Sequence, residues 1–279
     1  MPTPGLSLVG FMDQAQAINH LLGVCIPTSP AIPSLIAEWT AAVAKRGPPI
    51  ANAGNPDIQP IPADGQAYLA QLHQEKWVAD SLAMTPGATF QMVEIDPLLA
   101  YQFTVDNSRS SYHCGKLNPM PPLGDLLMVC LPTAFPNEQI NVTQQPSAVM
   151  LKTKSLNVRI VQQGFFQAEN KLGIQFGMSL PFVHVVRFNG RCYLHNGFHR
   201  IVGVRKKGAT HVPCLFRDVS TSQEAGIRDD GATFPLQLLQ SADPPTLAHF
   251  TQGRAYDVTL KAMTRIVHVT WHEYGIPDE

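Results

Sequence analysis

The segment Asn196-Gly197-Phe198-His199-Arg200 holds the residue types in this chain that are best suited to chemistry. It follows a predicted strand and opens a short predicted helix, whose first turn has unpaired backbone N–H groups and a partial positive charge. Such a turn can bind an anion. Gly197 would let the backbone approach a ligand, and Arg200 offers a planar fork for two phosphate oxygens. His199 could donate to phosphate or transfer a proton. The segment predicts a phosphate site, with a purely structural turn as the alternative.

The sequence before and after this segment predicts regular secondary structure that would hold it in place. Asn189-Gly190 is a strong hairpin signal between two β-rich runs within residues 181–194. The stretch "FHRIVGVRKKG" predicts a helix that ends at Gly208, and residues 211–219, "HVPCLFRDV", predict the next strand. The phosphate site is therefore expected at a loop between a hairpin and a helix.

The same region resembles the core of the ParB N-terminal/sulfiredoxin superfamily, in which a strand ends in a "D/N-G-x-H/R-R" loop before a helix. The matching residues are Asn196-Gly197-Phe198-His199-Arg200, then Gly208, then Val212-Pro213-Cys214. Residues 92–101, "MVEIDPLLAY", resemble the opening strand of that family more weakly. The match is centred on residues 181–219 and leaves out the first 85 residues and the last 60.

The resemblance implies a nucleotide-binding enzyme that uses ATP or CTP with Mg²⁺ and hydrolyses or transfers a phosphoryl group. In that case Asn196, Gly197, Phe198, His199 and Arg200 hold phosphate, and His199 and Arg200 form the catalytic pair. The resemblance also suggests a second anion contact at Ser108 and Arg109, for which a solvated turn is the alternative. Asp106 and Asp218 are candidate ligands for a magnesium ion that accompanies the nucleotide.

Two departures from the family narrow the expected chemistry. Phe198 stands where a sulfiredoxin carries its catalytic cysteine, and Cys192 and Cys214 are not at the matching position. No helix-turn-helix pattern follows residue 219. Repair of sulfinic acids and partitioning of DNA are both disfavoured on these grounds.

Two further functions remain as alternatives to the nucleotide enzyme. One is a ParB-like nuclease or nucleic-acid-binding protein, although a formal net charge of −1 argues against strong non-specific binding of DNA or RNA. The other is a non-catalytic interaction module whose N-terminal section docks a protein partner or a second copy of the chain.

Composition bounds the class of protein. Of the 279 residues, 44% are hydrophobic and only 15% are charged, which fits a globular protein with a substantial core. Five cysteines without a CxxC pair argue against a disulfide scaffold or a structural zinc site, so reduced thiols and a cytoplasmic location are expected. No apolar run reaches the length of a membrane helix, so no membrane partner is expected.

The predicted fold class is α+β, with a helical N-terminal section over residues 1–85. Over residues 86–279 the resemblance implies a ParB/sulfiredoxin-like mixed sheet with short helices and a C-terminal extension. Apolar spacing predicts helices over residues 6–24, after Ser34, after Asp64 and around 235–250. Residues 107–125 are expected to form turns, and the short apolar run 126–132, "LLMVCLP", is expected to be a buried strand. Further strands are predicted over residues 88–105, 148–163 and 265–275.

Overall fold

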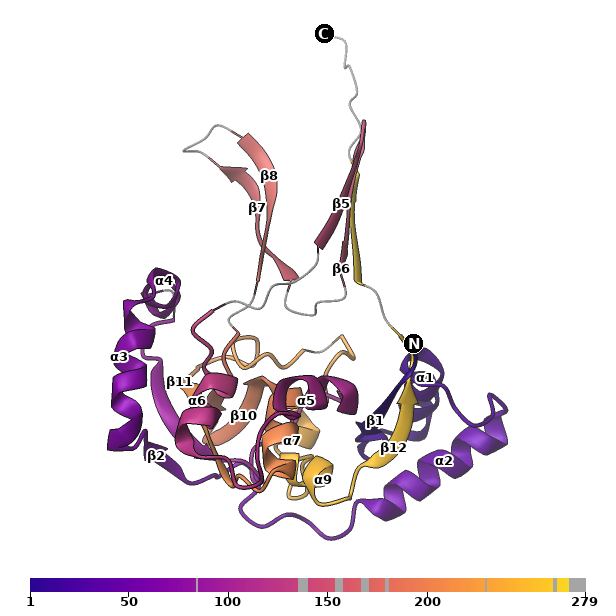
Figure 1. The fold of residues 1–279 in the computed structure, drawn as a ribbon. Coiled ribbons are helices and arrows are strands. Elements are labelled where there is room, and N and C mark those ends of the chain that lie inside the picture. Colours follow the sequence, from indigo (N-terminus) through magenta and orange to yellow (C-terminus); the bar gives the residue numbers. More distant parts are fainter. Residues whose placement is uncertain are drawn as a thin grey trace. The chain divides into compact units, whose positions relative to one another are not determined.

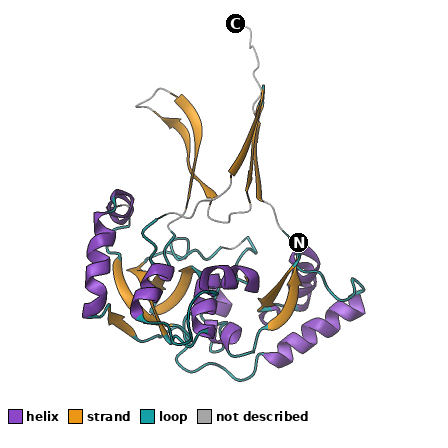
Figure 2. Ribbon diagram, viewed as in Figure 1, coloured by secondary structure: helices purple, strands orange, loops and turns teal. Residues whose placement is uncertain are grey.

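A computed structural model describes residues 1–83, 85–134, 140–153, 158–166, 171–178, 181–228, 230–262 and 265–270. The fold is mixed α and β, as expected (Figures 1 and 2). The chain divides into two compact units, Met1–Thr133 with Phe182–Lys261, and Ala134–Pro181 with Ala262–Glu279. The predicted helical section over residues 1–85 lies within the larger unit.

The larger unit contains a five-stranded sheet in the order β10-β9-β11-β3-β2. Its strands are β10 (Arg191–Asn196), β9 (His184–Phe188), β11 (His211–Asp218), β3 (Thr89–Glu94) and β2 (Ile58–Pro60). β9 and β10 form an antiparallel hairpin, and both residues of its Asn189-Gly190 turn have positive φ, at 48° and 74°. Helix α7 (Phe198–Lys206) connects β10 to β11, which runs parallel to β9. The predicted hairpin, helix and following strand are confirmed.

A smaller three-stranded sheet in the same unit joins segments that are far apart in the sequence. It consists of β12 (Tyr256–Leu260), β1 (Thr3–Ser7) and β4 (Thr104–Asp106), in that order. The N-terminal section therefore starts with a strand, where a helix from residue 6 was expected. The section continues with η1 (Val9–Phe11), α1 (Gln14–Val24), α2 (Ile32–Lys45), η2 (Ala63–Gly65), α3 (Gln66–Gln74) and α4 (Lys76–Ala83).

Two expectations for the middle of the chain are wrong. Residues expected to form turns contain helix α5 (Asn107–Cys114), and the expected strand at 126–132 lies largely within helix α6 (Leu123–Cys130). The run "LLMVCLP" is too short for its apolar pattern to separate a strand from a buried helix. In the structure it buries Leu126, Leu127 and Cys130, which share one helical face.

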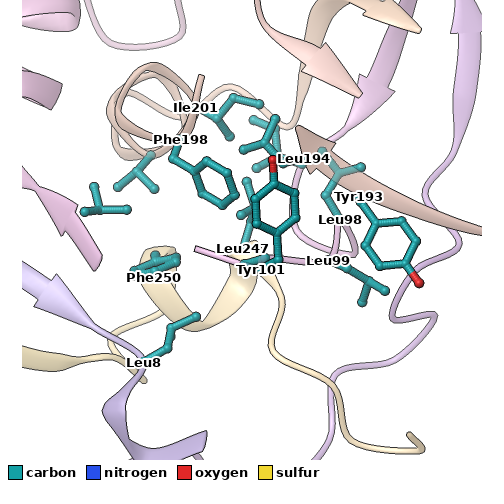
Figure 3. Packing of buried hydrophobic residues seen from close by; sticks show 14 of the residues in the cluster. Leu8, Leu98, Leu99, Tyr101, Tyr193, Leu194, Phe198, Ile201, Leu247 and Phe250 are labelled. Atoms are coloured by element: carbon teal, nitrogen blue, oxygen red, sulfur yellow. The ribbon is translucent and has the colours of Figure 1, made fainter. Parts of the chain in front are cut away.

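The core of the larger unit surrounds helix α7. Phe198 is 3% exposed, and its ring meets that of Tyr101 edge to face, with 5.7 Å between centroids. Figure 3 shows both rings with Ile201 of the same helix and with Leu247 of α9 (Leu247–Thr251), which follows α8 (Leu236–Leu239). This packing fixes the position of α7 and of the loop that precedes it.

The second unit consists of strands in the residues that the structure describes. β5 (Ile140–Gln145), β6 (Ala148–Thr153) and β13 (Arg265–Thr270) form a sheet in the order β13-β6-β5, and β7 (Val158–Phe166) pairs with β8 (Lys171–Met178). The part of the predicted last strand beyond residue 270 lies outside the described residues. Across the described chain, no helix has both the length and the apolar character needed to cross a membrane.

Candidate functional site

Gly197 begins helix α7 and has a left-handed backbone conformation, with φ at 101°. A Cβ atom at this position would lie 2.8 Å from Cγ2 of Val183. The glycine is thus required by backbone conformation and by packing against Val183. The sequence predicts that this glycine makes room for a ligand. In the structure, the space that a Cβ atom would occupy is taken by Val183. Glycine also has no side chain to cap the helix, and α7 carries no side-chain cap.

The side chains on either side of Gly197 are structural. Asn196 donates from Nδ2 to the carbonyl of Phe182 at 3.0 Å, which ties the end of β10 to the residue pair before β9. The Phe198 ring lies in the core against Tyr101 (Figure 3). Both residues hold the loop in place.

Arg200 faces the interior and is 8% exposed. Its Nη1 donates to the carbonyls of Val129 and Cys130, at 3.3 and 3.4 Å, and so satisfies the last turn of α6. Burial lowers the pKa of the guanidinium. Consecutive helical residues point about 100° apart, so Arg200 and its neighbour His199 cannot serve the same face. The structure therefore places the Nη1 atom of Arg200 against the end of α6.

His199 links α7 to the start of α5. Its Nδ1 accepts a hydrogen bond of 3.2 Å from the backbone N–H of Asp106. Since a backbone N–H can only donate, Nδ1 carries no proton, and the proton of the neutral ring is on Nε2. Burial, aided by the charge of Arg109, lowers the pKa of His199 to about 4. The ring is therefore neutral at pH 7 and offers an Nε2–H donor, which suits the binding of an anion better than proton transfer.

Ser108 and Arg109 lie in the first turn of α5, where Asp106 is the N-cap. The Asp106 Oδ1 atom accepts from the amides of Ser108 and Arg109 at 2.8 and 3.4 Å, and Oδ2 accepts from Thr3 Oγ1 at 3.0 Å. The Arg109 Nε atom lies 3.9 Å from Oδ2. These amides serve the carboxylate of Asp106, so this turn is closed to a second anion.

The first turn of α7 differs from that of α5. Neither the amide of Phe198 nor that of His199 donates a hydrogen bond to any residue that the structure describes. Further along this turn, the amide of Ile201 donates to the carbonyl of Gly197 at 2.9 Å. Two amides and the Nε2–H of His199 are thus the donors that this turn leaves for a ligand.

Asp106 is the residue whose role sequence reasoning missed. It was considered only as a magnesium ligand, although an aspartate directly before "NSRS" is also an N-cap signal. Asp218, the other candidate, forms two hydrogen bonds with Arg187, at 2.6 and 2.9 Å. The described residues contain no group of three or more metal-ligating side chains. Both aspartates thus have protein partners in the structure.

The cysteines lie in the core of the larger unit as free thiols. Burial raises the pKa of Cys192 to about 11 and that of Cys130 to about 12, so both thiols stay protonated at pH 7. Their state gives no support to thiol chemistry next to the loop.

No protein-family model matches the sequence, and no curated protein or solved structure matches the chain.

Proposed function

We propose that the chain binds a phosphate group of a nucleotide, ATP or CTP, at the first turn of α7. The observation that carries this proposal is the open turn: glycine at the N-cap provides no cap, and the amides of Phe198 and His199 have no acceptor in the described chain. Amides at a helix N-terminus, together with the helix dipole, favour a phosphate at this position.

His199 adds a third donor to these amides. Its Nδ1 is occupied by the Asp106 amide, which orients the ring and leaves the proton on Nε2. A neutral donor can stabilise charge on a phosphate oxygen without giving up its proton. In the proposed site His199 is thus a phosphate ligand, and Arg200 supports the turn from the interior.

The resemblance of residues 196–200 and 208–214 to the ParB N-terminal/sulfiredoxin superfamily supports a nucleotide as the source of the phosphate. The same resemblance supports hydrolysis or transfer of a phosphoryl group. In such a reaction the turn would act by positioning the phosphate and balancing its charge. Since Asp106 and Asp218 are engaged elsewhere, we expect any Mg²⁺ to enter with the nucleotide and to be held chiefly by its phosphates.

A thermal-shift titration tests the proposal. ATP, CTP and inorganic phosphate are added separately, with and without Mg²⁺, and the melting temperature of the full chain is followed. A ligand at 100 times its Kd stabilises the folded state by about 2.7 kcal/mol. We expect at least one nucleotide to raise the melting temperature, and release of inorganic phosphate or a transferred phosphoryl group is then measured in the same mixture.

The matched variants are His199→Gln and His20→Gln. His20 is also a half-buried neutral histidine of the larger unit, with Nε2 lying 3.3 Å from Ser7 Oγ and a pKa lowered to about 4 by partial burial. We expect His199→Gln to weaken nucleotide binding at least tenfold and His20→Gln to leave it unchanged. If neither nucleotide nor phosphate stabilises the wild-type chain, the proposal is wrong.

A further inference from the structure

Three nitrogen-bearing side chains come together on neighbouring strands of the five-stranded sheet, apart from the donors of the α7 turn. His184 lies on β9, His195 on β10 and Arg217 on β11, and these strands are adjacent in the sheet. His184 is in register with Leu215, two residues before Arg217. Since side chains two apart on a strand point to the same face, His184 and Arg217 are diagonal neighbours on one face.

His195 joins this pair because the strand is irregular at this point. The register of β10 shifts between Leu194 and Asn196, which marks a β-bulge that re-aims the intervening side chain. The rings of His184 and His195 meet edge to face, with 4.9 Å between centroids. The His195 ring is held by its Nδ1, which lies 3.2 Å from the carbonyl of Ala225.

Two of these side chains carry buried atoms that lack a partner. His184 is 8% exposed, and its Nε2 has no hydrogen-bond partner in the described chain. The Nε of Arg217 is buried and likewise unsatisfied. Buried side-chain nitrogens in folded proteins nearly always have a partner, and leaving one unsatisfied costs about 1–3 kcal/mol. Two such atoms on adjacent strands indicate a shared acceptor.

We infer that His184 and Arg217 bind a single oxyanion group, a carboxylate or a phosphate, on this face of the sheet. The Nε–H of Arg217 can only donate, and the neutral ring of His184 can place its proton on Nε2, so one oxygen-bearing anion accepts from both. A cation does not fit, because arginine has no lone pair to offer and carries a positive charge.

The electrostatics of the pair agree with an anion. Burial, together with the charges of His195 and Arg217, lowers the pKa of His184 to about 3. His184 is therefore a neutral donor at pH 7, and the guanidinium of Arg217 supplies the positive charge that favours an anion at this position. This site shares no side chain with the three donors of the α7 turn, so the inference does not depend on the proposed function.

The test is a titration followed by NMR of the ring nitrogens in histidine-labelled full-length protein. Sodium phosphate and sodium acetate are added in separate series, and the His184 signal is assigned by its loss in His184→Gln. We expect a saturable shift of the His184 signal with at least one anion, and the anion that binds more tightly identifies the group as phosphate or carboxylate. The His199 signal reports separately on the α7 turn, so failure of one site does not imply failure of the other.

Two arginine variants complete the test. Arg217→Gln should weaken the anion at least tenfold, and it should leave the fold intact because it removes an unsatisfied donor. Arg187→Gln is the matched control, since Arg187 lies on β9, points to the opposite face and is already paired with Asp218. A His184 signal that neither anion shifts, as expected if only water fills the position, would overturn the inference. So would equal anion affinity in wild type and Arg217→Gln.

Discussion

Helices α5 and α7 both follow a strand, but the backbone amides in their first turns differ in their hydrogen bonds. Each follows directly on a strand, β4 or β10, and the two starts are joined by the bond between the Asp106 amide and His199. In α5 the carboxylate of Asp106 accepts from two amides, whereas in α7 the N-cap is Gly197 and no side chain among the described residues caps the turn. One side chain, that of Asp106, thus decides whether the amides of a helix start have an acceptor within the described chain.

A second contrast lies within the first turn of α7. His199 faces the start of α5, where its Nδ1 accepts from the Asp106 amide and its Nε2 therefore carries the proton. Arg200 faces the last carbonyls of α6. The family resemblance implies that His199 and Arg200 form a catalytic pair, but in the structure they contact different helices. The predictions below test these two contrasts, from the largest expected effect to the smallest.

Removal of Arg200 is expected to have the largest effect on stability. Arg200→Ala deletes a buried charged group that donates to two carbonyls, and hydrogen bonds to charged groups contribute about 1.5–3 kcal/mol each. We expect the free energy of unfolding to fall by about 3 kcal/mol or more, measured by urea denaturation. Lys76→Ala, at an exposed ion pair, serves as the control and should change stability by less than about 1 kcal/mol. A fully stable Arg200→Ala protein would mean that the guanidinium is not a structural cap.

Low pH should protonate His199 and break its hydrogen bond with the Asp106 amide, which joins the starts of α5 and α7. The pKa of His199 lies near 4 in the folded chain and near 6.5 in the unfolded chain, so the unfolded state takes up the proton first as the pH falls. The stability that His199 contributes is complete above pH 6.5 and is lost as the pH drops towards 4. One pKa unit corresponds to about 1.4 kcal/mol, and partial exposure of the ring reduces the expected loss to about 1–3 kcal/mol.

Urea denaturation at a series of pH values measures this loss. The wild-type chain should lose stability between pH 6.5 and pH 4 more steeply than His199→Gln, which has no titrating group at this position. Parallel curves for the two proteins would show that His199 is not the half-buried neutral histidine that the structure describes.

Gly197→Ala tests why the N-cap of α7 is a glycine. An alanine must adopt φ near 101° and place Cβ 2.8 Å from Val183 Cγ2, so we expect a loss of about 1–2 kcal/mol. The matched control is Gly23→Ala in α1, where a Cβ meets nothing within 4 Å and stability should rise by about 0.5–1 kcal/mol. Equal stability of Gly197→Ala and wild type in thermal unfolding would contradict this explanation.

Asp106→Ala should remove the carboxylate that accepts from the backbone amides in the first turn of α5. Loss of an N-cap costs about 1 kcal/mol, and the variant also loses the bond from Thr3. The amides of Ser108 and Arg109 would then be available, and phosphate should shift their NMR signals in the variant but not in wild type. Asp13→Ala, which removes the equivalent cap of α1, controls for the general effect of losing a cap. If phosphate leaves these two signals unmoved in Asp106→Ala, the carboxylate is not what closes the turn.

Local sequence signals predicted much of the region around the loop. Asn189-Gly190 and Gly208 each require a positive φ, and they fixed the ends of the hairpin and of α7. The helices α5 and α6 were missed. The residues of α5 are mostly polar, and its helical state depends on the Asp106 cap and on close packing against α7, where Gly203 lies against Cys114.

Long-range contacts account for the rest of what sequence could not predict. β1 pairs with β12, about 250 positions away in the sequence, and with β4, about 100 positions away. Local periodicity carries no information about such partners. The same limit applies to the loop. Arg200 contacts the carbonyls of Val129 and Cys130, and His199 contacts the Asp106 amide. These contacts depend on how distant parts of the chain fold together, so local sequence could not predict them.

The most direct test of the account is a nucleotide titration of ¹⁵N-labelled protein, followed through four backbone amides. Those of Phe198 and His199 report on the open turn of α7, and those of Ser108 and Arg109 report on the closed turn of α5. We predict that ATP or CTP shifts the first pair saturably and leaves the second pair nearly unchanged. Saturable shifts confined to Ser108 and Arg109, or no shift in either pair, would contradict the account.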